Sequence, residues 1–524
     1  MPTTMVGNLE VGKLKVGWAR THMPVLEAIR ARFADERPFD GLTISAVLHV
    51  EAKTCALALA LQAGGGTVRL AASNPLTTDD DAVAAVRAEG VETHAVRGES
   101  IEDYRAGLSR LLDREPDLII DDGADLVALV HERRRDRGRL RGSTEETTTG
   151  VTRLRALEKA GRLLFPAVNV NDAMMKHLFD NRYGTGQSTV EGIVNATNLL
   201  IAGKVAVVAG YGWCGRGVAS RLRGFGAEVI VTEVDPVRAI EARMDGFAVR
   251  PMREAARVAD LIVTVTGRPG VVRAEHFAIL KDGCLLANSG HFDVEVLKVD
   301  LDKLASSHRT VRPNVEEYRF ADGRRAYLLA EGRLVNLAAA QGHPVEIMDL
   351  SFALQALSAE HLARHGPAMP AKVHPVPPEV DRAVAVAALA PFGIGLDEPT
   401  GEQLKYAKTH EWVKVEGKRV TVGITDHAQS ELTDIVFVDL PTVGKPVEPG
   451  KAVLSLESVK TVSDVYAPGA GRVVEVNGEL KAHPELVNQD PYGRGWLFRL
   501  ELTGAIDPTL VDADGYRRLV GAPA

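Results

Sequence analysis

The sequence predicts an α/β protein in which two domains of alternating strands and helices precede a small all-β domain. The chain has 524 residues, enough for about three domains. Apolar strand-like segments alternate with helical segments up to about Gly342, which is typical of parallel sheets covered by helices. From about Gln403 onward, valine-rich segments separated by Gly and Pro replace the helices, which predicts an all-β domain.

The first alternating unit is predicted from three consecutive patterns. Residues 42–50 ("LTISAVLHV") form an apolar run that indicates a buried strand, and residues 54–64 ("TCALALALQAG") indicate an apolar helix. Residues 117–126 ("DLIIDDGADL") predict a strand that runs into an acidic turn. This alternation favours a parallel sheet covered by helices.

The second unit is predicted to follow a helix over residues 187–203 and to open with the strand and turn "KVAVVAGYGWCGRG". Beyond it, residues 345–364 predict a long helix. The proline-rich residues 365–380 predict a loop or a crossing linker, and residues 381–393 predict a short helix.

The β domain is expected to begin after a junction near residues 399–403. Its strands are predicted from alternating, valine-rich segments bounded by Gly and Pro turns. These segments are "WVKVEGKRVTVGIT", "DIVFVDLP", "KAVLSLESVK", "GRVVEVNGEL" and "GWLFRLEL".

Composition excludes several classes of function. The net charge of −8 argues against nucleic acid or an anionic membrane as the main partner. The three cysteines show no disulfide or zinc spacing, so we expect no metal site and a reducing compartment. The first residues lack the basic stretch and apolar core of a signal peptide, and no apolar run is long enough to span a membrane, which predicts a cytoplasmic location.

Gly210, Gly212 and Gly215 form a G-x-G-x-x-G turn between a predicted strand and a predicted helix. Such a turn lets the backbone approach a pyrophosphate, which then binds at the helix N-terminus. Glu233 ends the next strand, where a carboxylate hydrogen-bonds the ribose hydroxyls of NAD and repels the extra phosphate of NADP. The pattern predicts a Rossmann domain that prefers NAD, although Arg238 lies nearby; a glycine turn needed only for packing is the alternative.

Several dense polar segments surround this turn. They are "LHVEAKT", "DDGADL", "STEETTTGV", "NVNDAMMKHLFDNRYGTGQS", "NSGHFDVE" and "LLAEGRLVNLAAAQGHP". These segments, in this order over about residues 14–400, resemble the S-adenosylhomocysteine hydrolase family. The form that they resemble is the shorter one found in thermophiles and archaea. Ordinary NAD dehydrogenases do not share these segments.

The resemblance implies a substrate domain over residues 1–185 completed by 343–380, an NAD-binding domain over 186–342, and a helix with a linker over 381–402. It also implies reversible hydrolysis of S-adenosyl-L-homocysteine to adenosine and L-homocysteine. In this family, NAD transiently oxidises the ribose 3′-hydroxyl, which acidifies the C4′ proton and lets homocysteine leave. Water then adds and the ketone is reduced, so that no net redox change occurs.

The resemblance assigns roles to individual residues. Lys176 and Asp180 would hold the ribose hydroxyls, and Lys176 would be the base for the 3′-hydroxyl, which requires a depressed pKa. Asp122 would take the C4′ proton, and His49 would assist the leaving thiol and the incoming water. Glu146 would orient the sugar or Lys176. The remaining substrate-binding residues implied in this way are Thr54 and His343, the latter at the substrate entrance.

The residues implied to bind NAD lie in several separate segments. They are Thr147, Thr148, Thr149, Asn181, Gly210, Gly212, Trp213, Cys214, Gly215, Arg216, Gly217, Glu233, Ser289, Gly290, His291 and Asn336. Within the glycine turn, Cys214 is expected to be a small packing residue rather than a reactive thiol.

Three departures from the larger family form affect these expectations. Glu51 and Lys53 alter the segment that reads the purine edge in that form, so inosine is an alternative to adenosine. Thr185 stands where many relatives have a cysteine. The usual C-terminal tail, which reaches the NAD of a neighbouring subunit, is absent, and another domain occupies its position. The resemblance still implies a homo-oligomer, but this departure leaves the choice between dimer and tetramer open.

Lys460 lies between two alternating apolar runs that predict an exposed hairpin tip. Around it, the segments "KTHEWV", "VTVGITDHAQ", "DIVFVDLPTVG", "SLESVKTVSDVYAPGAGRVVEVN" and "PELVNQDPYGRGWLFRLEL" resemble the glycine cleavage system H protein. That family is a small β-sandwich that carries lipoate on one lysine, and Lys460 matches this lysine. No methionine flanks Lys460, which disfavours biotin; an unmodified surface lysine is the alternative.

Together the resemblances imply a hydrolase fused to a lipoyl carrier over residues 403–524, with both parts in one-carbon metabolism and the hydrolase in the methyl cycle. The carrier implies glycine decarboxylase, aminomethyltransferase and lipoate ligase as partners. An alternative is that the lipoyl-like domain only docks the hydrolase to a partner. Another alternative is hydrolysis of S-inosylhomocysteine.

Overall fold

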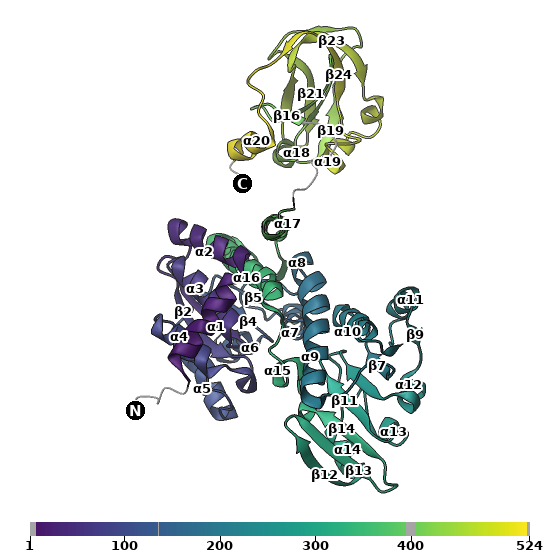
Figure 1. Ribbon diagram of the computed structural model, residues 1–524. Helices are drawn as coiled ribbons and strands as arrows, with labels where there is room; N and C mark the ends of the chain where they lie inside the picture. Colours follow the sequence, from purple (N-terminus) through teal and green to yellow (C-terminus); the bar gives the residue numbers. More distant parts are fainter. Residues whose placement is uncertain (1–6, 135, 395–403, 521–524) are drawn as a thin grey trace. The chain divides into compact units, whose positions relative to one another are not determined.

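The computed structural model describes residues 7–134, 136–394 and 404–520. The chain divides into two compact units, Met1–Ile394 and Gly395–Ala524 (Figure 1). The junction predicted near residues 399–403 falls in the gap between the second and third described ranges, so it lies outside the described residues. Within the described residues, no helix is both long and apolar enough to cross a membrane.

The first sheet of the N-terminal unit has seven strands, and all of its pairs are parallel. In spatial order they are β15 (Val373–Pro375), β6 (Ala167–Asn169), β5 (Gly142–Glu145), β4 (Leu118–Asp121), β1 (Thr43–Leu48), β2 (Thr67–Ala72) and β3 (Glu92–His94). The chain order reverses between β1 and β4, and such a reversal opens a crevice at the carboxyl ends of the strands.

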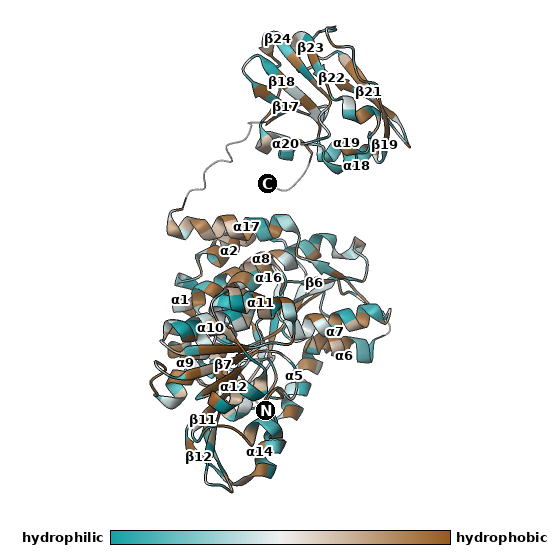
Figure 2. Ribbon diagram, turned by 90° about the vertical axis from the view of Figure 1, so that its right-hand side faces the viewer, coloured by the Kyte–Doolittle hydropathy of each residue, from teal (hydrophilic) through white to brown (hydrophobic). Residues whose placement is uncertain are grey.

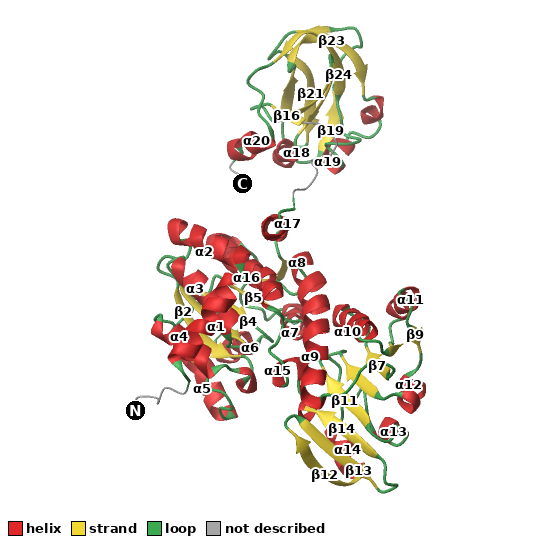
Figure 3. Ribbon diagram, in the orientation of Figure 1, coloured by secondary structure: helices red, strands yellow, loops and turns green. Residues whose placement is uncertain are grey.

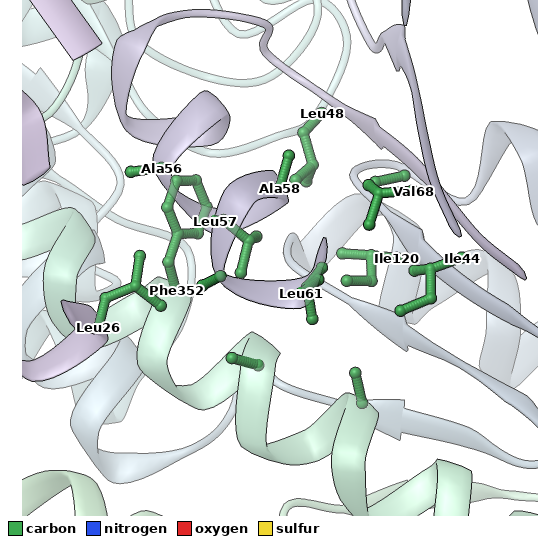
Figure 4. Packing of buried hydrophobic residues seen from close by; sticks show 14 of the residues in the cluster. Leu26, Ile44, Leu48, Ala56, Leu57, Ala58, Leu61, Val68, Ile120 and Phe352 are labelled. Carbon is green, nitrogen blue, oxygen red and sulfur yellow. The ribbon is translucent and has the colours of Figure 1, made fainter. Parts of the chain in front are cut away.

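The core of this domain forms where helices cover the first sheet. α2 (Pro24–Glu36), α3 (Ala52–Ala63) and α16 (Val345–His365) pack together, and α16 belongs to the chain that returns after the second domain. Figure 4 shows Leu57 of α3 beside Phe352 of α16. Both side chains are buried, and burial of such a side chain contributes about 1.5–3 kcal/mol to the free energy of unfolding.

The second sheet has eight strands. In spatial order they are β12 (Ala305–Arg312), β13 (Val315–Phe320), β14 (Arg325–Leu329), β11 (Cys284–Asn288), β10 (Leu261–Thr264), β7 (Val205–Ala209), β8 (Glu228–Thr232) and β9 (Ala248–Val249). From β9 to β14 the pairs are parallel and the order reverses between β7 and β10. Brown, hydrophobic residues run along β7 in Figure 2, as expected for a strand buried on both faces.

Helices cover both sheets of this unit (Figure 3). Besides those named above they are α1 (Leu9–Thr21), α4 (Asp80–Ala88), α5 (Ile101–Asp113), α6 (Asp125–Arg133), α7 (Thr148–Lys159), α8 (Met174–Lys176), α9 (Thr185–Thr197), α10 (Trp213–Gly224), α11 (Pro236–Met244), α12 (Met252–Val258), α13 (Ala274–Phe277), α14 (Lys298–Leu304), α15 (Val335–Ala338) and α17 (Pro378–Leu389).

Two predicted elements differ from the structure. The helix predicted over residues 187–203 is α9, which ends at Thr197 because Asn198 adopts a left-handed conformation with φ 54°. The proline-rich stretch predicted as a loop contains β15, whose pairing with β6 extends the first sheet. Pro375 is tolerated because β15 is an edge strand, where a missing N–H leaves no neighbour without a partner.

The C-terminal unit consists of two antiparallel sheets around one hydrophobic core. The larger sheet contains, in order, β16 (Leu404–Tyr406), β17 (Glu411–Glu416), β18 (Arg419–Ile424), β24 (Phe498–Ile506), β23 (Gly469–Val476) and β20 (Pro446–Val447). The smaller sheet contains β19 (Ile435–Val438), β21 (Ala452–Ser458) and β22 (Val462–Tyr466). The predicted class, α/β domains followed by a small β domain, is confirmed.

Candidate active site

A cavity of about 840 Å³ lies at the carboxyl ends of the parallel strands of both sheets of the N-terminal unit. His49 follows β1, Asp122 follows β4 and Glu146 follows β5, so the first sheet contributes three polar side chains to one wall. The second sheet contributes the glycine turn after β7 and the turn Ser289–His291 after β11. The cavity therefore joins the two positions at which the strand orders reverse, where open α/β sheets bind their ligands.

Lys176 lines this cavity and is 4% exposed. It ends α8, and the chain continues as a π-helix over His177–Gly184. The Lys176 ammonium donates to Asp180 Oδ1 at 3.0 Å and to Asn181 Oδ1 at 2.8 Å. The wider turn of a π-helix brings positions four and five residues further along the chain to the same side, which explains how both residues reach Lys176.

Asp180 and Glu146 form the carboxylate environment of Lys176. Asp180 Oδ2 accepts from Ser351, and Asp180 Oδ1 lies 3.2 Å from His343 Nδ1. Glu146 Oε1 lies 3.4 Å from the Lys176 ammonium, and Glu146 Oε2 accepts from Gln355. Ser351 and Gln355 both belong to α16, so the returning helix completes the site.

The pKa of Lys176 differs from the sequence prediction. Burial alone would lower this pKa, but the charges of Asp180 and Glu146 outweigh burial and raise it. The expectation of a depressed lysine pKa is therefore wrong for these surroundings, which favour the ammonium form of Lys176. Conversely, burial acts to raise the pKa of Asp180, but Lys176 and His343 hold it well below its usual range. Burial raises the pKa of Glu146 to about 7, although Lys176 opposes this shift.

His49 and Asp122 form a second pair in the cavity. His49 Nε2 lies 3.3 Å from Asp122 Oδ2, and His49 Nδ1 lies 2.7 Å from the Thr77 hydroxyl. Burial lowers the pKa of His49, while the nearby Asp122 acts in the opposite direction. Asp122 Oδ1 is buried without a hydrogen-bond partner among the described residues, so it is free to accept from a ligand.

Glu145 supports this wall from behind. Its Oε1 accepts from Gly123 N, Thr147 N and the Thr147 hydroxyl, each at 2.9 Å. One carboxylate thus fixes both the turn that carries Asp122 and the start of the threonine segment. Burial raises the pKa of Glu145 well above its ordinary value, and the neighbouring Asp121 adds to this effect.

The glycine turn after β7 fits a dinucleotide pyrophosphate. Gly210 has φ +103°, which a side chain would disfavour, and a Cβ on Gly215 would lie 2.0 Å from Gly210 O. Gly212 precedes α10, and the N-terminus of this helix has no side-chain cap, so its N–H groups are available to phosphate oxygens. Glu233 Oε2 accepts from Tyr211 N at 2.6 Å, which places the carboxylate at the end of β8 beside the turn.

Most of the predicted site residues line the cavity. Those that do are His49, Thr54, Asp122, Glu146, Thr147, Thr148, Thr149, Lys176, Asp180, Asn181, Gly212, Trp213, Cys214, Ser289, Gly290, His291, Asn336 and His343. Predicted residues that do not are Gly210, Gly215, Arg216, Gly217 and Glu233. Gly217 serves packing, because a Cβ there would lie 1.8 Å from Arg182 O of the π-helix.

Several residues of the site were missed by the sequence analysis. They are Ser73, Thr77, Glu145, Arg153, Ser351 and Gln355. Ser351 and Gln355 carried a usable signal, since they are polar residues four apart in a helix that is otherwise largely apolar. The other four residues hydrogen-bond to His49, to Asp122 or to the turn after Asp122 from segments more than 20 residues away in the sequence, and no spacing rule identifies such contacts.

The segment that departs from the larger family form borders the cavity. Glu51 caps α3 by accepting from Lys53 N and Thr54 N. The Lys53 ammonium donates to the carbonyl oxygens of Gln341 and His343. Both charged groups are thus partly engaged by the protein itself.

In the C-terminal unit, Lys460 lies exposed in the turn between β21 and β22. Ser458 N donates to Thr461 O at 2.8 Å, and the Ser458 hydroxyl accepts from the backbone N–H groups of Lys460 and Thr461. The neighbouring Val459 and Val462 are 71% and 61% exposed. The hairpin therefore presents one lysine on a hydrogen-bonded turn.

Comparison with known proteins matches both units. Three family models match the chain. The model for S-adenosyl-L-homocysteine hydrolase matches residues 4–139, and the model for the NAD-binding domain of that family matches residues 181–342. The model for the glycine cleavage H-protein matches residues 404–521. These families account for both expected cofactors, NAD and lipoate.

Individual relatives agree with these models. The adenosylhomocysteinase of Pyrococcus abyssi is 55% identical over 399 residues, covering 76% of this chain and 94% of the relative. The S-inosyl-L-homocysteine hydrolase of Methanocaldococcus jannaschii is 52% identical, covering 75% of this chain and 95% of the relative. A crystal structure of a glycine cleavage system H protein from Mycobacterium marinum is 38% identical over 23% of this chain and 98% of that chain, with a TM-score of 0.22. The chain belongs to the S-adenosyl-L-homocysteine hydrolase family and contains, in addition, a glycine cleavage H-protein domain.

Proposed function

We propose that the N-terminal unit catalyses the reversible, NAD-dependent hydrolysis of S-adenosyl-L-homocysteine to adenosine and L-homocysteine. The observation that carries this proposal is the buried cluster of Lys176, Asp180 and Glu146, in a cavity that also borders Gly212 of the dinucleotide turn. Such a cluster is suited to bind a ribose diol beside a redox cofactor. In this proposal the substrate domain comprises residues 1–185 and 343–380, and the cofactor domain comprises residues 186–342.

The protein groups supply binding and proton transfer. Bound NAD supplies a reversible hydride acceptor at the ribose 3′ carbon. Lys176 and Asp180 hold the 2′- and 3′-hydroxyls, and Lys176 accepts the proton of the 3′-hydroxyl. Asp122 takes the C4′ proton, for which its unpartnered Oδ1 is available. His49, which lies 3.3 Å from Asp122, exchanges a proton with the leaving thiol and the incoming water.

The raised pKa of Lys176 sets a condition on this assignment. An ammonium cannot accept a proton, so Lys176 must lose one before it acts as a base. Because Asp180 and Glu146 are what stabilise the ammonium, substrate hydroxyls that engage these carboxylates would weaken that stabilisation. Substrate binding thus prepares the base.

The base of the nucleoside defines a second candidate function, hydrolysis of S-inosyl-L-homocysteine. It is favoured by the relatives that bear this name and by Glu51 and Lys53 at the cavity. The test is homocysteine release, measured by thiol trapping with both substrates side by side, while absorbance follows NADH. Thiol release without net NADH supports the proposed reaction, and the substrate that is hydrolysed faster identifies the nucleobase, adenine or hypoxanthine. Absence of thiol from both substrates, with NAD bound, contradicts it.

For the C-terminal domain we propose that Lys460 carries lipoate and that the domain exchanges aminomethyl groups with glycine decarboxylase and aminomethyltransferase, after attachment by a lipoate ligase. The exposed Lys460 turn supports this proposal. We further propose that the protein is a cytoplasmic homo-oligomer with both parts in one-carbon metabolism and the hydrolase in the methyl cycle. A domain that only docks a partner would bind glycine decarboxylase without turnover, which separates the two interpretations.

A further inference from the structure

A cluster of two histidines and one glutamate lies in the C-terminal unit, outside the Lys460 turn. His410 belongs to the turn before β17, whereas His427 and Glu431 lie one helical turn apart on α18 (Asp426–Leu432). One ligand atom of each residue lies within 4.8 Å of the others, and His427 Nε2 is 3.5 Å from Glu431 Oε1. We propose that these three residues bind a divalent transition-metal ion of the Zn²⁺ class.

The donor set fits that class of ion. Two imidazole nitrogens and one carboxylate oxygen suit Zn²⁺ and related borderline ions, whereas Ca²⁺ and Mg²⁺ prefer oxygen ligands alone. Residues four apart on a helix lie on one face, so His427 and Glu431 approach an ion from the same side. His410 approaches from a separate segment, and three ligands leave a fourth position for water.

A second observation concerns the orientation of His410. Its Nδ1 lies 2.6 Å from the Tyr516 hydroxyl, which in turn lies 2.8 Å from the Thr425 hydroxyl. This hydrogen bond leaves Nε2 of His410 available to bind a metal ion. Metal-binding histidines are commonly oriented by a hydrogen bond to their other ring nitrogen. His410 also has φ 71°, a sparsely populated backbone conformation for a residue other than glycine. Residues held in such conformations cluster at ligand-binding sites.

The location gives the ion a structural role. Tyr516 belongs to α20 (Ala513–Leu519), and Figures 2 and 3 show α18 and α20 at the same end of the β domain. An ion at this position links the turn before β17 directly to α18, and through Tyr516 to α20. We therefore expect metal binding to stabilise this end of the domain. Sequence spacing gave no sign of the site, because His410 and His427 are brought together only by the pairing of β17 with β18.

The test uses the untagged full-length chain in a Lys460→Arg background, so that no lipoyl dithiol competes for metal. After chelator treatment, Zn²⁺ binding is measured against a chromogenic competitor, and Co²⁺ binding by visible absorption. We expect one equivalent of Zn²⁺, a Co²⁺ spectrum of a site with fewer than six ligands, and a higher Tm of the β domain with Zn²⁺. His427→Asn and Glu431→Gln should each weaken binding by at least 10-fold.

A matched control is His483→Asn, since His483 and Glu485 form an exposed pair in the same domain at 3.0 Å. This variant should bind Zn²⁺ as the parent does. An unchanged metal-free Tm in His427→Asn shows that the variant folds. Equal Zn²⁺ binding by the parent and His427→Asn, or a Co²⁺ spectrum identical to that of the aqueous ion, overturns the proposal.

Discussion

The Lys176 ammonium lies 3.0 Å from the carboxylate of Asp180, in a cluster from which solvent is almost excluded. In the proposed mechanism, this pair couples the charge of the base to the group that holds the ribose. A base that is stabilised as its conjugate acid acts only after its partner has been engaged by substrate. Under the proposed mechanism, the pair would link binding of the diol to the onset of proton transfer.

Replacing Lys176 with arginine tests this link. Lys176→Arg keeps the positive charge beside Asp180 but cannot lose a proton near neutral pH. We expect kcat for homocysteine release to fall by about 10²–10⁴-fold, the usual contribution of a positioned acid or base. The NAD content of the purified protein should not change. Lys159→Arg, an exposed substitution on α7, is the control, and wild-type kcat in Lys176→Arg would rule out proton transfer by Lys176.

A second prediction concerns the pH dependence of the reaction. Burial raises the pKa of Glu146 to about 7, so this carboxyl gains a proton as the pH falls through about 7. Protonation removes the carboxylate charge with which Glu146 orients the sugar, and in the proposed mechanism this loss of substrate positioning outweighs the easier loss of a proton from Lys176. We expect kcat/KM to decrease on the acid side with an apparent pKa near 7, and Glu146→Gln to lack this step. An unchanged acid limb in Glu146→Gln would assign the ionisation to another group.

Part of this site follows from strand order alone. His49 and Asp122 directly follow two apolar strands, and polar residues at the carboxyl ends of parallel strands converge at the crevice where the order reverses. Their 3.3 Å contact is what that rule anticipates. The family segments identified Lys176 and Asp180, but no periodicity indicated the π-helix that carries Asp180, because its hydrogen-bond pattern leaves no signal in the sequence.

Other features could not be predicted because they depend on chain segments far apart in the sequence. β15 forms at the edge of the first sheet only because β6 offers an unpaired side, and its own sequence is proline-rich. The raised pKa of Lys176 depends on the balance between burial and two carboxylates, and only distances decide which of these effects is larger.

A third prediction concerns Glu145, which holds the turn directly after Asp122 and the start of the threonine segment. Glu145→Asp shortens the side chain, so one carboxylate can no longer reach both Gly123 N and Thr147 N. A displacement of about 1 Å at catalytic groups costs up to about 10²-fold in rate, so we expect kcat to fall by that order while the KM changes little.

The control is Glu145→Gln, which retains one oxygen at the original position and should restore most of kcat. Because burial and Asp121 raise the pKa of Glu145, an uncharged isostere is compatible with its surroundings. An equal decrease in kcat in Glu145→Asp and Glu145→Gln would show that kcat depends on the charge of Glu145 rather than on the length of its side chain.

The last prediction concerns the Lys460 turn. When the chain is produced with a lipoate ligase and lipoate, intact mass spectrometry should show the addition of one lipoyl group, which Lys460→Arg abolishes. Lys451→Arg, at the other end of the same strand, should leave it unchanged. Ser458→Ala removes the hydroxyl that accepts from Lys460 N and Thr461 N, so the tip loses its fixed position. Because a ligase must find one lysine among many, we expect slower modification of Ser458→Ala at an unchanged Tm. If Ser458→Ala is modified at the parental rate, exposure of Lys460 alone directs the ligase, and the order of the turn is not required.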